Sequence, residues 1–170
     1  MAFSIYEASI PVYLRQLSAL SAILTKAAAY SAQRKIDPAA LVNARLYPDM
    51  IPLVGQVQSA CNHARRGAAR LSGAELERVE DKESTFDELQ ALIARTVESL
   101  KRMDPKKMEG MENRTVTFPS GDHKTTMSAP DYLHHFSMPN FYFHVTTAYA
   151  ILRHNGLEIG KSDFMGQRTS

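Results

Sequence analysis

Apolar residues recur every three or four positions in four stretches of this chain, a spacing that predicts four amphipathic helices. The first expected helix runs from about Ser9, whose side chain suits an N-cap, to Arg34. The second begins near Asp49 as its N-cap, has Pro52 in its first turn, and ends at Gly73, a residue type favoured just after a helix. Two helices joined by a connector therefore occupy the first part of the chain.

A capping-box pattern marks the start of the third helix, and β-prone residues follow its end. Thr85 and Glu88 can satisfy each other's free backbone N–H groups, and the helix should end before Asp104, which precedes a proline. Residues 115–118 and 124–127 are rich in β-prone side chains, and Pro-Ser-Gly-Asp separates them. We expect a small β-hairpin here, lying across the helices, because an isolated hairpin is only marginally stable.

The fourth helix should begin at Ser128-Ala129-Pro130-Asp131 and stop at Gly156. Pro139 lacks a backbone N–H, so the helix should be kinked or interrupted near residues 135–137. Residues 132–152 carry no Asp, Glu, Lys or Arg, as in a membrane span, but they include three histidines and several other polar side chains. Such groups are costly in lipid, so we expect no membrane partner and a helix buried in protein, with its polar groups facing an internal cavity.

Composition adds limits to this helical pattern. The chain has 170 residues and is 44% hydrophobic, which suits one globular domain over residues 1–170. Its single cysteine, Cys61, cannot form an internal disulfide, and the N-terminus has no signal-peptide pattern, so a cytoplasmic location is expected. The formal net charge is +2, which argues against a nucleic-acid partner because such binders need a clustered basic surface.

Three arginines of the second helix, Arg65, Arg66 and Arg70, lie off its apolar stripe and have two interpretations. One is a phosphate-binding site. The other is a solvated helix face, which is favoured because no aromatic residues interleave with the arginines and no glycine-rich loop accompanies them.

The best candidate for chemistry is His144, which lies within the apolar stripe of the fourth helix, one turn after Asn140. A buried histidine needs a hydrogen-bond partner, so His144 is either a satisfied core residue or a site residue. His63 lies two turns after Gln56 on the flank of the second helix, and both can face one cavity. Cys61 falls on the buried stripe and is interpreted as an inert small apolar residue.

Several segments resemble a known superfamily. The segment His144–Gly156 resembles the closing motif of DinB/YfiT-like proteins, in which a histidine begins a helical turn ending in Leu-Arg and then glycine. Pro52-Leu-Val-Gly-Gln56 is similar to the second-helix motif of that superfamily. Asn43–Met50 and Pro139–His144 resemble an uncharacterised, domain-of-unknown-function branch of it, and the resemblance covers nearly the whole chain.

The resemblance implies an all-α, four-helix bundle with an up-down-down-up arrangement, often dimeric, so a homodimer is expected. The superfamily typically holds a divalent metal with three histidines in a central cleft. On this chain those positions fall on Gln56, Asn140 and His144, so one of the three remains histidine. Amide oxygens are poor ligands for zinc or nickel, and we therefore expect neither a metal nor another cofactor. Other donors would have to complete a metal site: Asp49, His63 or His135.

We therefore expect a small-molecule enzyme with a cleft between the second and fourth helices. His144 would take or give a proton, and Gln56 and Asn140 would donate hydrogen bonds to a carbonyl or oxyanion. The expected rim residues are Asp49, His63 and Tyr142. An isomerase, dehydratase or cyclase would need no metal. The alternatives are a non-catalytic ligand-binding or stress-associated homodimeric bundle, a structural or interaction module, and a metal-dependent thiol transferase or isomerase.

Overall fold

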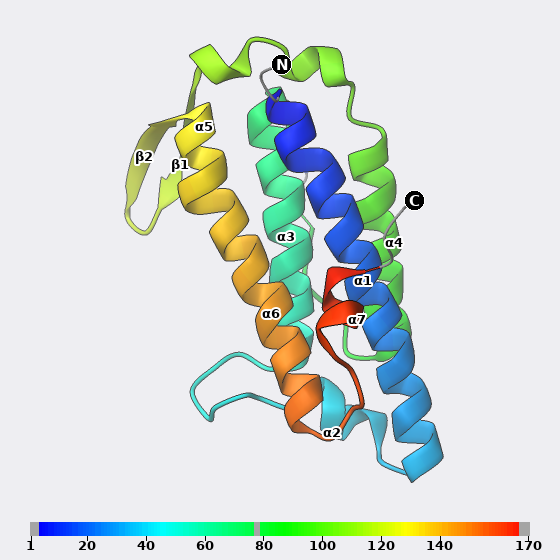
Figure 1. Cartoon of the computed structure of the whole chain (residues 1–170). Coiled ribbons are helices and arrows are strands. Elements are labelled where there is room, and N and C mark those ends of the chain that lie inside the picture. Colours follow the sequence, from blue (N-terminus) through cyan, green and yellow to red (C-terminus); the bar gives the residue numbers. More distant parts are fainter. Residues whose placement is uncertain (1–3, 77–78, 167–170) are drawn as a thin grey trace.

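Four long helices lie side by side as a bundle in the computed structural model, which describes residues 4–76 and 79–166 (Figure 1). They are α1 (Ile5–Arg34), α3 (Leu53–Ser72), α4 (Phe86–Lys101) and α6 (Met138–His154). In Figure 1, α1 and α6 run down the view while α3 and α4 run up it, because the long connection after α3 returns the chain along the bundle. The predicted up-down-down-up helical bundle is therefore confirmed.

Shorter elements connect and cover the long helices. They are α2 (Pro38–Val42), the 3-10 turns η1 (Pro105–Met108) and η2 (Met111–Asn113), α5 (Ala129–Asp131), the π-helical turn η3 (Tyr132–Ser137) and α7 (Lys161–Met165). The last of these packs on α1, where the Gln16 side-chain amide donates to the Phe164 carbonyl at 2.7 Å and Lys26 pairs with Asp163. The C-terminal segment is thus fastened to the first helix (Figure 1).

A buried hydrogen bond joins two side chains in the core between the helices. Tyr13 of α1 and Ser137 of η3 are buried, and their hydroxyl oxygens lie 2.8 Å apart in a hydrogen bond. The Tyr13 ring also meets the Phe141 ring edge-on, with centroids 5.0 Å apart. Gly67 of α3 gives the two hydroxyls room, since a Cβ there would lie 2.5 Å from Ser137 Oγ and 2.6 Å from the Tyr13 oxygen.

Two predicted helix starts are wrong. Ser4 caps α1, because its hydroxyl accepts from the Glu7 N–H at 3.1 Å while Glu7 accepts from the Ser4 N–H. Ser9 lies inside the helix, where its buried hydroxyl donates to the Ile5 carbonyl at 2.6 Å. Asp49 is exposed in the connection before α3, which begins at Leu53 with no side-chain cap. The Leu53 N–H instead donates to the Ala44 carbonyl, a backbone contact that local sequence does not reveal.

The α-helix expected from Ser128 to Gly156 is interrupted before Pro139, as predicted. Residues 132–137 form the π-helical turn η3, and Pro139 follows in the first turn of α6. The side-chain amide of Asn140 donates to the Phe136 carbonyl at 2.7 Å. This bond satisfies a backbone acceptor at the junction, where the regular ladder is disturbed.

The predicted hairpin is present, with longer strands than expected. Strand β1 (Thr115–Ser120) pairs antiparallel with β2 (His123–Ser128), and the register joins Val116 with Met127 and Pro119 with Lys124. Gly121 and Asp122 form the two-residue turn between the strands. Gly121 has a φ of +61°, a value that favours glycine. His123 is the first residue of β2. Proline is tolerated in β1 because each strand of a two-stranded sheet has one unpaired edge.

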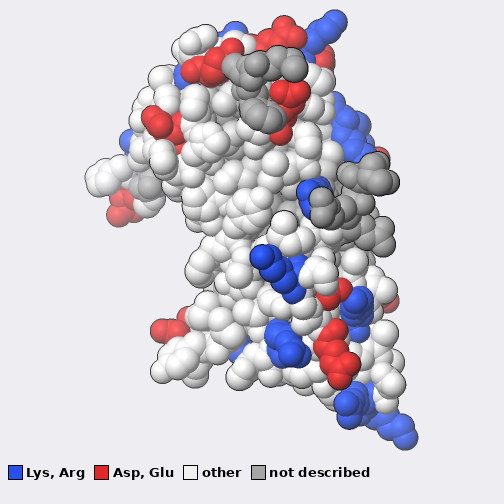
Figure 2. Space-filling model, viewed as in Figure 1, with Lys and Arg blue, Asp and Glu red and all other residues white. Residues whose placement is uncertain are grey.

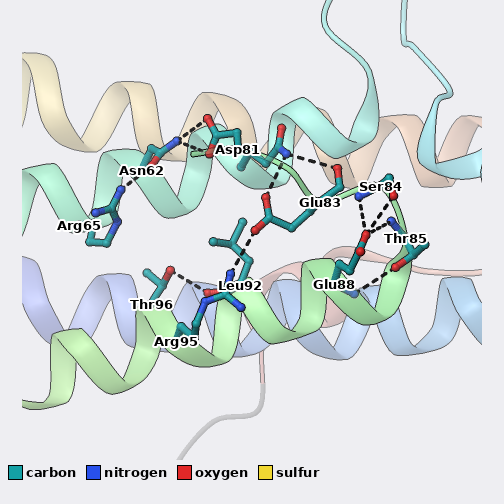
Figure 3. Close-up of polar contacts among 11 residues, drawn as sticks. Asn62, Arg65, Asp81, Glu83, Ser84, Thr85, Glu88, Leu92, Arg95 and Thr96 are labelled. Carbon is teal, nitrogen blue, oxygen red and sulfur yellow. Dashed lines mark hydrogen bonds and ion pairs between the residues drawn. The ribbon is translucent and has the colours of Figure 1, made fainter. Parts of the chain in front are cut away.

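The capping box of α4 is confirmed (Figure 3). The Glu88 N–H donates to Thr85 Oγ1 at 3.2 Å, and the Glu88 carboxylate accepts from the backbone N–H groups of Thr85 and Ser84. Hydrogen bonds from Ser84 and Thr85 hold the pKa of Glu88 below its ordinary value. The cap fixes the point where the connection from α3 enters α4.

Thr85→Ala should lower the free energy of unfolding by about 1 kcal/mol, because the Glu88 N–H loses its acceptor. Chemical denaturation followed by circular dichroism measures the change. Thr146→Ala, at an exposed position of α6, is the control and should change the free energy by less than about 0.5 kcal/mol. Equal losses in the two variants would contradict the capping role.

On the face in Figure 2, blue and red side chains lie at the two ends of the bundle and along its right side. A broad uncharged area covers the centre and left of this face. The helices of residues 4–76 and 79–166 include none with the length and apolar character needed to cross a bilayer.

Candidate functional site

The contact between α3 and α6 brings Gln56 and His144 together. Gln56 is in the first turns of α3 and is 1% exposed, and half-buried His144 is in the middle of α6. Gln56 Oε1 and His144 Nδ1 lie 2.8 Å apart. A stripe position of each helix therefore carries a polar group, and the two groups satisfy each other, as buried polar groups must.

The hydrogen bonds of Gln56 fix the proton on His144. Gln56 Nε2 donates to the Ile51 carbonyl at 3.2 Å, and a carbonyl oxygen only accepts, so the amide group has one orientation. Its Oε1 then faces His144 and accepts from Nδ1–H. The neutral His144 ring consequently carries its hydrogen on Nδ1 and a free lone pair on Nε2.

A second imidazole lies against the first. The rings of His63 and His144 are stacked, with centroids 5.3 Å apart and planes 19° apart. Burial lowers the pKa of His63 to about 4, and the charges of His144, Arg66 and Arg70 contribute to this shift. Burial also lowers the pKa of His144. Both rings are therefore mainly uncharged at neutral pH.

Aromatic rings connect this pair of histidines to the β-hairpin. Phe136 lies beside His63, with centroids 6.4 Å apart, and Phe118 of β1 lies 4.5 Å from Phe136. Tyr132 completes the cluster, and the Arg70 guanidinium lies over the rings of Phe118 and Tyr132. The hairpin thus anchors an apolar wall beside His63.

The other predicted site residues take no part in the Gln56–His144 hydrogen bond. Asn140 uses its amide nitrogen on the Phe136 carbonyl, and among the described residues no hydrogen bond joins it to Gln56 or His144. Tyr142 is 38% exposed; burial raises its pKa, and the charge of Arg15 on α1 opposes that shift. Asp49 is exposed in the connection before α3. The structure brings together Gln56, His144 and His63.

The residues at the superfamily's metal positions do not fit a divalent metal. Gln56 Oε1 accepts from His144, and the stacked planes of His63 and His144 do not aim two lone pairs at one point. His135 is exposed, and its Nε2 lies 3.8 Å from Asp131 Oδ1. Over residues 4–76 and 79–166, no three His, Cys, Asp or Glu side chains are grouped closely enough to hold an ion.

Cys61 lies on the buried face of α3. It is fully buried, and burial raises its pKa to about 12. A thiol that stays protonated is a poor nucleophile, so Cys61 acts as a small apolar side chain.

Sequence reasoning missed the stacking of His63 on His144 and the aromatic wall. The spacing of Gln56 and His63, two turns apart on one helix, was the available signal for the first. The wall has no such signal, because its rings come from β1 and η3, which meet only in the fold.

Comparison with known proteins places the chain in a family. The family described as "Domain of unknown function (DUF1993)" matches residues 5–165. The chain belongs to the DUF1993 family. A crystal structure of a DinB family member protein from Shewanella denitrificans resembles this DUF1993 chain, with 33% identity over 97% of this chain and 93% of that one, and a TM-score of 0.88. No curated protein matches it. The expected DinB-like branch of unknown function is therefore confirmed.

Proposed function

We propose that this DUF1993 chain is a small-molecule enzyme that transfers a proton without a metal, with His144 Nε2 as the base. The observation that supports it is the hydrogen-bond series from the Ile51 carbonyl through Gln56 to His144, which leaves the Nε2 lone pair unprotonated. The lowered pKa of His144 keeps that lone pair available at neutral pH.

The Gln56–His144 hydrogen bond also suits the step in which protonated His144 gives its proton back. When Nε2 takes a proton, the ring becomes a cation, and Gln56 Oε1 continues to accept from Nδ1–H. An oriented carbonyl dipole stabilises that cation less than a carboxylate would, which matches a base that must release its proton again. Gln56 is then a positioning residue, a role that replaces the oxyanion donor expected from the sequence.

The reaction class follows from these groups. Isomerisation, dehydration and cyclisation can each begin with removal of a proton from a carbon beside a carbonyl, and the proton returns to another atom of the substrate. His63 supplies a neutral flat wall beside the base. Asn140 retains a second amide hydrogen that can orient a substrate oxygen. The expected homodimer, small-molecule ligand and cytoplasmic location stay predictions.

Substitution of His144 should abolish proton exchange. In D2O, the wild-type chain should accelerate exchange of the hydrogens beside the carbonyl in some members of a panel of small ketones, aldehydes and hydroxy acids, measured by proton NMR. His144→Gln should lower that rate by about 100-fold or more, since general bases contribute on the order of 10²–10⁴. His154→Gln, at an exposed position of the same helix, should leave the rate unchanged. A chelator should also have no effect.

A measurement without substrate tests the central assumption. Nitrogen-15 correlation spectra of the histidines should show the hydrogen of neutral His144 on Nδ1, and Gln56→Leu should remove that preference. A hydrogen on Nε2 in the wild-type chain would contradict the proposed base. Retained exchange in a folded His144→Gln chain would contradict catalysis by this residue and favour a ligand-binding bundle.

A further inference from the structure

A row of side-chain contacts extends along α3 beyond the proposed base. The residues that face each other there recur at helical spacing: Gln56, His63 and Arg70 on α3, and Tyr132, Phe136 and His144 on η3 and α6. Residues seven apart on an α-helix are displaced by about 20°, so the three α3 residues lie on one face. We call these six residues the seam.

Contacts join the two sides of the seam in order. Starting from the base, the His63 ring stacks on the His144 ring, with centroids 5.3 Å apart. The Phe136 ring follows, 6.4 Å from the His63 ring and 5.7 Å from the Tyr132 ring. At the far end, Arg70 Nη1 donates to the Tyr132 hydroxyl at 3.2 Å. The seam thus leads from the proposed base to a guanidinium group.

Arg70 is held in place and keeps uncommitted hydrogen-bond donors. It is half-buried, and its guanidinium lies over the rings of Phe118 and Tyr132, 5.2 and 5.8 Å from their centroids. Within residues 4–76 and 79–166, the Tyr132 hydroxyl is the one hydrogen-bond acceptor of this side chain. A guanidinium has five N–H donors, so most of them remain for a ligand. Arg70 therefore does not lie on a solvated face, the interpretation favoured from the sequence.

The η3–α6 side of the seam offers Arg70 no carboxylate, because residues 132–152 contain no Asp or Glu. Among the described residues, Arg70 forms no ion pair, and neither does Arg66, which is exposed one turn earlier on α3. Burial and then the charges of His144, Arg66 and Arg70 lower the pKa of His63. The positive charge of the arginines therefore reaches the histidines.

Carboxylates beside α3 lie toward its α4 side. Asp81 is exposed, and both of its oxygens accept from the Asn62 amide at 3.0 Å (Figure 3). Glu75 is exposed beyond the end of α3 and lines, with Arg65, a cavity of about 240 Å³ that the end of α4 also borders. Because Asp81 bonds a residue one turn before Arg66, its charge opposes that of Arg66. The main cation of the seam is the half-buried arginine at its end.

The seam is open to solvent between two borders. Phe118 of β1 packs on Phe136, and the Ile51 carbonyl accepts from Gln56, so the hairpin and the connection before α3 border the seam. In Figure 2 the left outline of the molecule curves inward between these two segments, which Figure 1 locates. His63 and Phe136 are half-buried, so their rings are partly accessible between the borders.

Acidic residues of the two borders are matched by basic ones. Asp49 is exposed in the same connection as Arg45, and Asp122 is exposed two residues before Lys124 in the hairpin. Asp131 is exposed, and its carboxylate accepts a hydroxyl hydrogen bond at 2.7 Å at the start of α5. The borders therefore leave the guanidinium at the end of the seam without a carboxylate partner.

We propose that the substrate of this enzyme is an elongated organic anion whose carboxylate or phosphate group binds Arg70 while its reacting C–H reaches His144. Its apolar body lies on the rings of His63 and Phe136. The inference rests on the function proposed above for His144. Seven residues of an α-helix rise about 10 Å, so the charged group is several bonds away from the reacting carbon. Arginine forms paired hydrogen bonds to two oxygens of either head group.

Titration followed by two-dimensional NMR of the backbone amides tests the proposal, with 4-phenylbutyrate, 3-phenylpropyl phosphate and 4-phenylbutanamide as probes. The first two carry the two head groups, and the third is the neutral amide of the first. At least one anion should give saturable shifts in residues 63–70 and 132–144, and the tighter one identifies the preferred head group. The neutral amide should bind at least about tenfold more weakly, because it loses the charge-assisted hydrogen bonds.

Substitution of Arg70 separates binding from bracing of the hairpin. Arg70→Gln should remove the preference for the anion, so that the anion and the neutral amide bind equally weakly. If Arg70 only braced the hairpin, both probes would weaken together and the preference would remain, which would contradict the proposal. Arg102→Gln, with the same change of charge at an exposed position of α4, should leave both affinities unchanged.

Two comparisons distinguish this inference from the proposed function. His144→Gln should still prefer the anion, since the head group lies at the other end of the seam. Anion binding without any proton exchange would contradict the base and retain the Arg70 site. No saturable shift with either anion, or equal binding of the neutral amide, would overturn the Arg70 site even where His144 exchanges the hydrogens of neutral ketones.

Discussion

Gly67→Ala should lower the free energy of unfolding by about 2–4 kcal/mol, combining overpacking with strain on a buried hydrogen bond. The new Cβ would lie 2.5 Å from Ser137 Oγ and 2.6 Å from the Tyr13 oxygen, well inside contact distance. Neither hydroxyl can simply move away, because they are buried and bonded to each other at 2.8 Å. Burial also raises the pKa of Tyr13, so the phenol stays neutral and needs this partner. Urea denaturation measures the loss.

The same helix offers a control for the Gly67 substitution. At Gly55 a Cβ would lie 3.4 Å from the Ile51 side chain, an ordinary contact. Gly55→Ala should therefore be neutral or stabilise the chain by up to about 1 kcal/mol, since alanine is the better helix former. Adding Tyr13→Phe and Ser137→Ala to Gly67→Ala should recover part of the loss. A Gly67→Ala chain as stable as Gly55→Ala would contradict the close approach of α3 to this hydroxyl pair.

The helices could be predicted because their signals are local. The Thr85–Glu88 box, the glycine after α3 and Pro139 in α6 each act within one or two turns, and the structure keeps all three. The starts of α1 and α3 were misplaced for two different reasons. Ser4 and Ser9 are both plausible caps, and only burial of Ser9 decides between them. The start of α3 depends on the Ala44 carbonyl, which lies in another segment.

The candidate site could be predicted only in part. Helical spacing and family resemblance indicated Gln56 and His144, and these two side chains meet in the structure. Neither signal reveals the hydrogen bond from Gln56 to the Ile51 carbonyl. That bond orients the Gln56 amide and so decides which nitrogen of His144 carries the hydrogen. The role of Asn140 also depends on its surroundings, because the same amide can hold a substrate or the carbonyl of a disturbed helical turn. Such choices are made by tertiary contacts.

Acid should destabilise this chain partly through His63, and His63→Phe should reduce that loss. The folded chain holds the pKa of His63 at about 4, whereas an unfolded histidine titrates near 6.5. Between these values the unfolded chain binds more protons, so stability is full above about pH 6.5 and falls as the pH drops toward about 4. Because the ring is partly open to solvent, we expect about 1–2 kcal/mol from this residue.

Phenylalanine keeps a flat ring against His144 and Phe136 but has no proton to bind, so the variant isolates the titration from the packing. Urea denaturation at about pH 7 and about pH 4.5 gives the loss for each chain, and His63→Phe should show the smaller loss because it has one fewer group to protonate on unfolding. His134→Phe, an exposed histidine of η3, should lose as much as the wild-type chain. If His63→Phe also loses as much, the stacked pair is not held neutral by the fold, and the proposed base at His144 loses the environment that keeps its lone pair available at neutral pH.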